Sequence, residues 1–261
     1  MPQPTLTDVH VQAALTNVAV AYFQSEDNYV ADKMFPNVPV AFQANKYFVW
    51  NKADFFRDEA KLRADATESA GSGVNLNTQS YAAEVWALHQ DVGPQVRSNA
   101  DPAVDIDMTI TRVLMQKLLI RRDRFFASQY LTTGVWGTDN TGTAASSGGS
   151  PGTTTPVFWD DDANGDPFTD IAVGQTTLLQ NTGMLPNRLL LSWSAYQALR
   201  KHPLVIDRIK YTMAAFSGTV TPQLLAQAFD IESVVVSRAV YNSASEDLTA
   251  SMSFEIGRAH V

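Results

Sequence analysis

The chain contains no cysteine, which makes disulfide bonds and thiolate metal sites impossible. Basic residues are scarce: 19 Lys and Arg stand against 27 Asp and Glu, a net charge of -8. This balance argues against a protein that binds nucleic acid through a broad basic face, because phosphate binding needs clustered cations. No apolar run approaches a membrane span, and Met1–Thr7 lacks the basic and apolar regions of a secretory signal. We therefore expect a cytosolic product that makes no membrane contact.

Motifs for catalysis and cofactor binding are also lacking. The chain has neither a Walker-type phosphate loop nor a Gly-x-Gly-x-x-Gly motif, and its four histidines show no paired ligand spacing. Gly148–Gly152 matches the nucleophile-elbow pattern Gly-x-Ser-x-Gly. That motif needs a strand before it and a helix after it, whereas Ser, Thr and Gly lie on both sides here. We predict no catalytic residue, no cofactor and no enzymatic activity.

An acidic turn over residues 160–166 is a candidate cation site. It matches the first half of a calcium loop, in which alternating oxygens surround the ion and a glycine, Gly165, makes the turn. The closing glutamate of such a loop is missing, because Ile171 takes its place. The alternative is an acidic turn that caps a helix starting at Pro167. If a cation binds, its ligands come from Asp160, Asp162, Asn164 and Asp166.

Residues 101–136 predict one long helix that is apolar on two sides. Asp105 or Asp107 can cap or charge the first turn, and Gly134 follows the last turn as a stop signal. One stripe consists of Ile106, Ile110, Val113, Leu114, Leu118 and Phe125, and the other of Met108, Met115, Leu119 and Phe126. A helix with two apolar stripes must be packed from two directions, which predicts a central helix between two layers or two subunits.

The N-terminal region predicts an amphipathic helix over residues 7–24 and then an extended arm. The arm, Tyr29–Val40, contains Pro36 and Pro39, which preclude a regular helix and favour extended backbone. Such an arm has no core of its own, so we expect it to drape over another body through Met34, Phe35, Val38 and Val40.

Two segments with strand composition, Lys46–Lys52 and Gln79–Val92, flank a polar stretch over residues 58–77. Charges of both signs alternate in this stretch, which ends near Gly71-Ser72-Gly73. The pattern predicts a long two-stranded hairpin with a polar tip. Such a ribbon is marginal alone in water, so we expect it to rest on a neighbouring molecule; the alternative is an ordinary surface hairpin.

The second half of the chain begins with Thr132–Asp166, whose Gly, Ser, Thr and Asp content predicts a long surface loop or linker. Helices and strands then alternate, which predicts an α/β-type subdomain. The expected helices cover Pro167–Gln180, Trp193–Lys201, residues 203–211 and Pro222–Phe229, and the expected strands cover Arg188–Ser192 and Ile231–Arg238, with another starting at Ser251.

The last seven residues, Glu255–Val261, back-translate into codons that contain the opening of a common sequencing adapter. We therefore expect residues 255–261 to be a non-native tail and the natural chain to continue past Phe254.

Taken in order, these segments resemble the major capsid proteins of tailed bacteriophages, which have the Hong Kong 97-type fold. The resemblance covers nearly the whole chain up to Phe254 and lies in the order of many short motifs. They are Ala31–Val40, the strand with Trp50, Arg63-Ala64, Thr67-Glu68-Ser69, Phe125-Phe126, Thr133–Trp136, Thr182–Asn187, Leu199–Pro203 and Asp207–Lys210. The chain departs from the family at its C-terminus, where further strands usually complete the sheet behind the long helix.

The resemblance implies an α+β fold with five parts before the tail. They are an N-terminal arm (residues 1–44), an extended β-hairpin loop (45–95), a peripheral domain with the long spine helix (96–136), the Gly/Ser/Thr/Asp-rich loop (137–166) and a mainly axial, incomplete α/β domain (167–254).

The resemblance also implies a function. Copies of the chain would form pentamers and hexamers, and these would close into an icosahedral shell around the double-stranded DNA of a tailed phage or prophage, without sequence-specific contact. The chain would assemble in the bacterial cytoplasm and end in the virion, with scaffold, portal and decoration proteins as further partners. Expected subunit contacts are Met34, Phe35, Trp50, Arg57, Lys61, Arg63, Glu68 and Trp86.

Two other functions compete with this one. A cellular, encapsulin-like shell protein of the same fold would enclose enzyme cargo instead of DNA. A calcium-dependent binding module or hydrolase built on the turn at residues 160–166 would belong to another class altogether.

Overall fold

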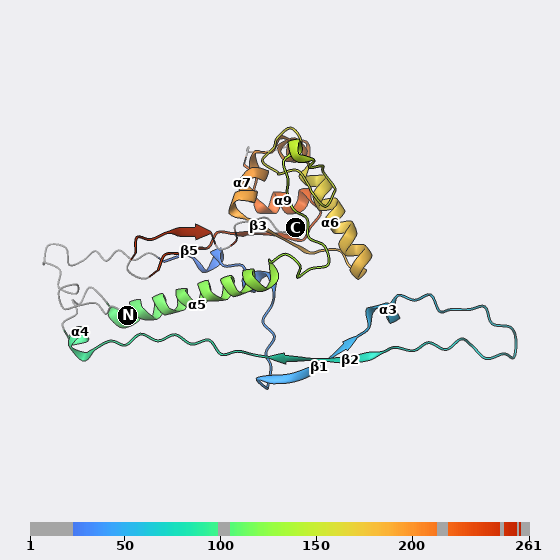
Figure 1. Ribbon diagram of the computed structural model, residues 1–261, viewed down its shortest axis with the longest axis horizontal. Helices are drawn as coiled ribbons and strands as arrows, with labels where there is room; N and C mark the ends of the chain where they lie inside the picture. The colour runs from blue at the N-terminus through green and yellow to red at the C-terminus, as the bar shows by residue number, and fades with distance from the viewer. Residues whose placement is uncertain (1–22, 99–104, 213–218, 246–247, 255, 257–261) are drawn as a thin grey trace. The chain divides into compact units, whose positions relative to one another are not determined.

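A computed structural model of the chain describes residues 23–98, 105–212, 219–245, 248–254 and 256. The chain divides into two compact units (Figure 1). The first unit takes in the described residues up to Pro36 and from Leu88 onward, and the second is Asn37–Ala87. The helix expected over residues 7–24 lies almost wholly outside the described residues, as does most of the tail expected over 255–261. The predicted separation of peripheral and axial domains stays a prediction.

The second unit is built on an antiparallel pair of strands, β1 (Ala44–Trp50) and β2 (Leu76–Ala82). Their register runs from Ala44 opposite Ala82 to Trp50 opposite Leu76. A single helical turn, α3 (Lys52–Phe55), follows β1, and a long loop then leads to β2 (Figure 1). The ribbon with a polar loop is the hairpin that the strand composition predicts.

The second strand of this hairpin is shorter at its far end than expected. The composition of Gln79–Val92 predicts a strand over that whole range, but β2 ends at Ala82. The last backbone bond beyond it runs from the N–H of Ala83 to the carbonyl of Gln43, 2.7 Å. Continuing the register would bring Ala87 opposite Pro39, which has no N–H to donate to a ladder. Strand composition therefore continues where strand pairing stops.

The long helix of the first unit, α5, spans Ile106–Tyr130. Asp105 is its N-cap and accepts a hydrogen bond from the N–H of Met108, 2.9 Å, so this residue and not Asp107 makes the cap. Asp107 instead pairs with Arg97 of the short helix α4 (Pro94–Ser98), at 2.8 Å. The helix ends at Tyr130, several residues before the predicted stop signal Gly134, which has φ +89.

The two apolar stripes of α5 are covered unequally. Phe126 is buried, whereas Met108 and Met115 on the same stripe are exposed over half their surface (51% and 54%). The residues of the other stripe from Ile106 to Leu118 are half-buried, and Phe125 is exposed. The C-terminal end of α5 is therefore packed into the first unit, while much of its N-terminal half keeps apolar surface in contact with solvent.

A parallel pair of strands joins the rest of the first unit to α5. The strands are β3 (Arg188–Ser192) and β4 (Ser233–Ser237), paired in register from Arg188 opposite Ser233 to Ser192 opposite Ser237. The helices α6 (Pro167–Thr182), α7 (Trp193–Lys201), α8 (Pro203–Thr212) and α9 (Pro222–Ala228) accompany them. All six elements lie within a few residues of the ranges predicted from the sequence.

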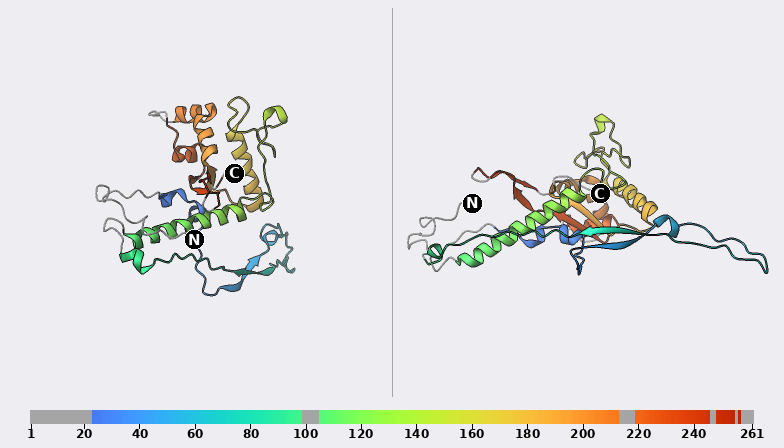
Figure 2. Two further views of the ribbon diagram at one scale, coloured as in Figure 1. Left: turned by 60° about the vertical axis from the view of Figure 1, so that its left-hand side comes forward. Right: turned by 60° about the horizontal axis from the view of Figure 1, so that its bottom comes forward.

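The pair β3–β4 separates two apolar cores. Leu189, Leu191 and Val236 point into a large core formed with α6 to α9, which lie on the side away from α5 (Figures 1 and 2). Leu190 points into a smaller core with Phe126 of α5. Because successive side chains of a strand alternate between its faces, a parallel pair covered on both faces requires continuous apolar runs. The runs Leu189–Leu191 and Val234–Val236 meet that requirement.

The loop over residues 137–166 is packed against the first unit and is not a free linker. Thr143 and Val157 form an isolated parallel bridge, and Val157 is buried. The carboxylate of Asp170 in α6 accepts hydrogen bonds from the N–H of Gly152, 2.6 Å, and from the indole Nε1 of Trp159, 2.8 Å. A short antiparallel pair, β5 (Val240–Asn242) and β6 (Met252–Phe254), completes the described elements.

Candidate functional site

The N-terminal segment over residues 24–35 is folded onto its own chain, which corrects the prediction of a fully extended arm. It contains a 3-10 turn (Glu26–Asn28) and one helical turn, α2 (Ala31–Met34). The helical turn ends before Phe35, whose backbone is extended at φ -121 and ψ 117. Pro36 accounts for this, because a proline disfavours helical backbone at the residue before it. The two prolines therefore set where the extended backbone begins and leave room for a helical turn upstream.

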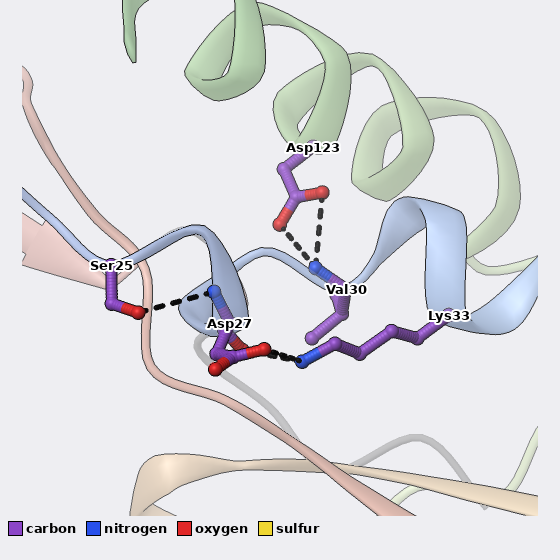
Figure 3. Close-up of polar contacts among 5 residues, drawn as sticks. All are labelled: Ser25, Asp27, Val30, Lys33 and Asp123. Carbon is purple, nitrogen blue, oxygen red and sulfur yellow. Dashed lines mark hydrogen bonds and ion pairs between the residues drawn. The ribbon is translucent and has the colours of Figure 1, made fainter.

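A buried carboxylate on α5 holds this segment (Figure 3). The side chain of Asp123 is 1% exposed. Its Oδ2 accepts a hydrogen bond from the N–H of Val30 at 2.9 Å, and its Oδ1 accepts one from the N–H of Ala31 at 2.8 Å. Val30 is the N-cap residue of α2 and its own side chain provides no capping bond. Asp123 therefore caps α2 from another part of the chain.

Polar contacts on both sides of Asp123 extend the attachment. The side-chain amide of Gln24 bonds both backbone groups of Val240 in β5, with Nε2 donating at 2.6 Å and Oε1 accepting at 3.0 Å. In this way a side chain imitates a neighbouring strand. Arg122, next to Asp123 on α5, forms an ion pair with Asp32 of α2. The segment is thus attached to α5 and to the C-terminal strands at separate points.

Apolar packing fixes the same segment. Val30 and Ala31 are buried in the smaller core with Phe126, Leu190 and Ile256, and Met34 packs against its edge. The ring of Phe35 lies 4.9 Å from that of Tyr130, centroid to centroid. Met34 and Phe35, two of the predicted subunit contacts, therefore lie on α5 of their own chain, although Phe35 keeps 42% of its surface exposed.

The hairpin of the second unit carries an apolar cluster at one end of one face. Phe48 and Trp50 on β1 and Leu76 on β2 lie on the same side of the ribbon, since Trp50 and Leu76 are directly opposite each other and Phe48 is two residues away. Their exposed fractions are 70%, 54% and 47%. Phe55, also exposed, adds its ring edge-on to Trp50 at 6.1 Å. We call Phe48, Trp50, Phe55 and Leu76 the apolar strip.

The opposite face of the ribbon mixes polar and apolar side chains, with Val49 and Tyr81 among them. Tyr47 donates a hydrogen bond to Oε1 of Gln79 across the strands, 2.8 Å, and Asn45 and Asn77 lie on the same side. Both faces of the hairpin are exposed, and the apolar strip is confined to the Trp50 end of one face, since Lys46, Thr78 and Ser80 continue that face.

The other residues predicted to make subunit contacts divide into two groups. Arg57 is engaged within the hairpin, because it pairs with Asp54 at 2.7 Å and with Glu59 at 3.5 Å. The side chain of Asp54 is buried and also accepts the N–H of Asn75, 2.9 Å, which ties α3 to the chain leading into β2. The remaining predicted contacts are exposed on the loop or beyond β2: Lys61, Arg63, Glu68 and Trp86.

The acidic turn caps a helix, as the alternative interpretation of it predicts. Asp166 is the N-cap of α6 and accepts hydrogen bonds from the N–H groups of Phe168 and Thr169 and from the Thr169 hydroxyl. Asp161 closes the turn by accepting from the backbone and the side chain of Asn164. In the part of the chain that the structure describes, no group of three or more His, Cys, Asp or Glu is arranged to hold a metal ion.

Hydrogen bonding shifts both carboxyls of this turn in the same direction. The Asn164 side chain is the largest influence on Asp161 and lowers its pKa from the usual 3.8. Burial raises the pKa of Asp166, but the bonds from Thr169 and Phe168 outweigh it, so the net shift is also downward. Both carboxylates therefore belong to the folded turn in their ionised form.

Comparison with solved structures shows the class of fold. A phage-related protein from Bordetella bronchiseptica matches with a TM-score of 0.60 and 22% identity, over 89% of this chain and 70% of that one. A structure from Mycobacterium phage Bobi matches with a TM-score of 0.47 and 16% identity, over 84% of this chain and 71% of its own. The chain therefore has a mixed helix and strand fold shared with a phage-related protein.

Comparison with curated proteins is more specific. The chain is 24% identical over 233 residues to the major capsid protein of Burkholderia phage BcepMu. The match covers 88% of this chain and 70% of that protein. No protein-family model matches the chain. The predicted resemblance to a phage major capsid protein is confirmed. The finer features of the Hong Kong 97-type fold stay a prediction.

Proposed function

We propose that this chain is the major capsid subunit of a tailed phage or prophage, and that its copies assemble into an icosahedral shell around double-stranded DNA. The comparison with the major capsid protein of phage BcepMu supports a phage capsid role and the virion as the location of the chain. That relative is a structural protein, which supports a role without catalysis. The pentamers and hexamers, the enclosed DNA and the scaffold, portal and decoration partners belong to the proposal alone.

The observation that carries the proposal is the apolar strip of the hairpin. Burying a side chain such as Phe or Leu contributes about 1.5–3 kcal/mol. An apolar strip exposed to water therefore lacks this contribution for several side chains. Soluble monomers rarely expose contiguous apolar patches without a partner. A second copy of the chain is the partner that a shell supplies, because every subunit then both offers a strip and covers one.

The elements map onto the parts of the Hong Kong 97-type fold as follows. The β1–β2 ribbon and its loop would be the extended hairpin, α5 the spine helix, and the unit from Pro167 onward the α/β part around the capsomer axes. The exposed residues of α5 near Met108 and Met115 would meet a neighbouring subunit. Among the described residues, no helix is long and apolar enough to cross a membrane.

A pair of adjacent substitutions tests the proposal. Phe48→Ser removes a ring from the apolar strip, while Tyr47→Ser makes a similar change one residue away on the opposite face. Each variant and the unchanged chain are purified and measured by light scattering and negative-stain electron microscopy. We expect large assemblies from the unchanged chain, a clear loss of them with Phe48→Ser, and a smaller effect with Tyr47→Ser. A monomeric unchanged chain, or equal assembly by all three, would count against the proposal.

A further inference from the structure

The contact between Asp123 and the N-terminal segment does more than add stability. A buried carboxylate is costly unless hydrogen bonds compensate for its lost hydration. Both oxygens of Asp123 receive backbone N–H groups, from Val30 and Ala31. The surrounding core is otherwise built of apolar side chains such as Phe126 and Leu190. An apolar residue at this position would leave these two N–H groups buried without acceptors, so the carboxylate ties the segment to α5 in a way that apolar packing cannot.

The carboxylate and the smaller core together fix the register of the segment. The two N–H groups belong to consecutive residues at the start of α2. The carboxylate that accepts from them lies 93 and 92 residues later in the sequence. A shift of the segment by one residue would bring a different pair of N–H groups to Asp123 and would take Val30, which is 0% exposed, out of its place in the core. Because every residue but proline offers such an N–H, the bonds hold the segment at Asp123, and the burial of the Val30 side chain selects which residues are held there.

The register determines where the second unit is joined to the first. The helical turn α2 ends at Met34, Phe35 packs on Phe126 and Tyr130, and the second unit begins at Asn37. We propose that Asp123 is a positioning residue for shell assembly, because it fixes the point on α5 from which the chain departs into the hairpin. This inference rests on the proposed capsid function. It assigns to Asp123 no contact with a neighbouring subunit.

The test compares two identical substitutions on one helix. Asp123→Asn keeps the size of the side chain but replaces one acceptor oxygen by an N–H donor and removes the charge. Asp107→Asn makes the same change at an exposed residue of α5 that pairs with Arg97. Amide hydrogen exchange over residues 24–36 reports the attachment, and electron microscopy of the full chain reports assembly. We expect exchange at Val30 and Ala31 to become about tenfold faster or more with Asp123→Asn, and closed shells to be lost. Asp107→Asn should change neither.

The unchanged chain provides a second measurement, which holds even if Asp123→Asn fails to fold. Amides in the first turn of a helix ordinarily exchange fast, but Val30 and Ala31 should exchange more slowly than Ile106 and Asp107 in the first turn of α5. Equal exchange rates at these two helix starts would contradict the proposal that Asp123 holds the segment. Normal shells from Asp123→Asn with fast exchange at Val30 would overturn the role in assembly. Absence of shells from the unchanged chain would overturn the proposed function itself. The exchange rates would still decide whether Asp123 holds Val30 and Ala31.

Discussion

Four aspartates give the described part of the chain much of its local order, each by accepting hydrogen bonds from N–H groups of another segment or of a helix start. Asp123 holds α2, Asp54 ties α3 to Asn75, Asp170 holds Gly152, and Asp166 caps α6. The carboxylates of the first three are buried or nearly so, and each accepts from a backbone N–H that no helix or strand supplies with a partner. Hydrogen bonds of this kind to a charged acceptor contribute about 1.5–3 kcal/mol.

The cap of α6 gives a prediction for a single residue. Asp166→Ala should lower the free energy of unfolding by about 1 kcal/mol, since it removes the acceptor of the first-turn N–H groups. Asp162→Ala, four residues earlier on the same turn and exposed, should change it by less than about 0.5 kcal/mol. Thermal or urea unfolding measures both. A larger loss with Asp162→Ala, or a melting temperature that rises with added calcium, would favour the cation loop instead.

The lowered pKa values of Asp161 and Asp166 predict a stability change in acid. A carboxyl whose folded pKa lies below its unfolded value of 3.8 stabilises the fold at higher pH and loses that contribution as pH falls through the folded pKa. Stability should therefore fall between about pH 5 and pH 2, and less so in a variant with Asp161→Asn and Asp166→Asn. Urea midpoints measured across this range give the comparison. Parallel curves for the two proteins would contradict the assignment.

At the scale of the element, α5 carries both a packed end and an open one. Phe126→Ala should cost about 3–5 kcal/mol, because Phe126 fills the smaller core between α5 and β3–β4. Met115→Ala on the same helix should cost less than about 0.5 kcal/mol, because Met115 is 54% exposed. Differential scanning calorimetry distinguishes these results. Similar losses would mean that the open half of α5 is covered after all.

Local signals in the sequence predict the elements between Pro167 and Ser237 closely. The cap Asp166 before Pro167 and Gly183, at φ 72, set both ends of α6, and the runs Leu189–Leu191 and Val234–Val236 identify β3 and β4. These signals act within one turn or one strand, so a single sequence carries them in full.

The side chains that hold distant backbone segments, such as Asp123, could not be predicted in the same way. Asp123 lies between Arg122 and Arg124, so the sequence reads as a solvated charge run on a helix. Its partners are backbone N–H groups of Val30 and Ala31, which every residue but proline offers and which therefore leave no trace in the sequence. Gln24 and Asp54 escape prediction for the same reason. The end of β2 was missed because pairing, and not composition, decides where a strand stops.

At the scale of the whole molecule, the net charge of -8 bears on contact with DNA. A chain with excess carboxylates should bind double-stranded DNA weakly and without sequence preference. We expect no retained complex in an electrophoretic mobility assay at about 0.15 M salt. A complex retained at this salt concentration would contradict the expectation. It would mean that Lys and Arg residues cluster into a local basic surface despite the negative net charge.

The proposed capsid function requires the chain to complete its burial of apolar surface with copies of itself. Sedimentation velocity over a range of protein concentrations measures this directly. We expect species much heavier than the 28.6 kDa chain, with a share that grows with protein concentration. A single species at the mass of one chain at every concentration, with the apolar strip of the hairpin still exposed, would contradict it.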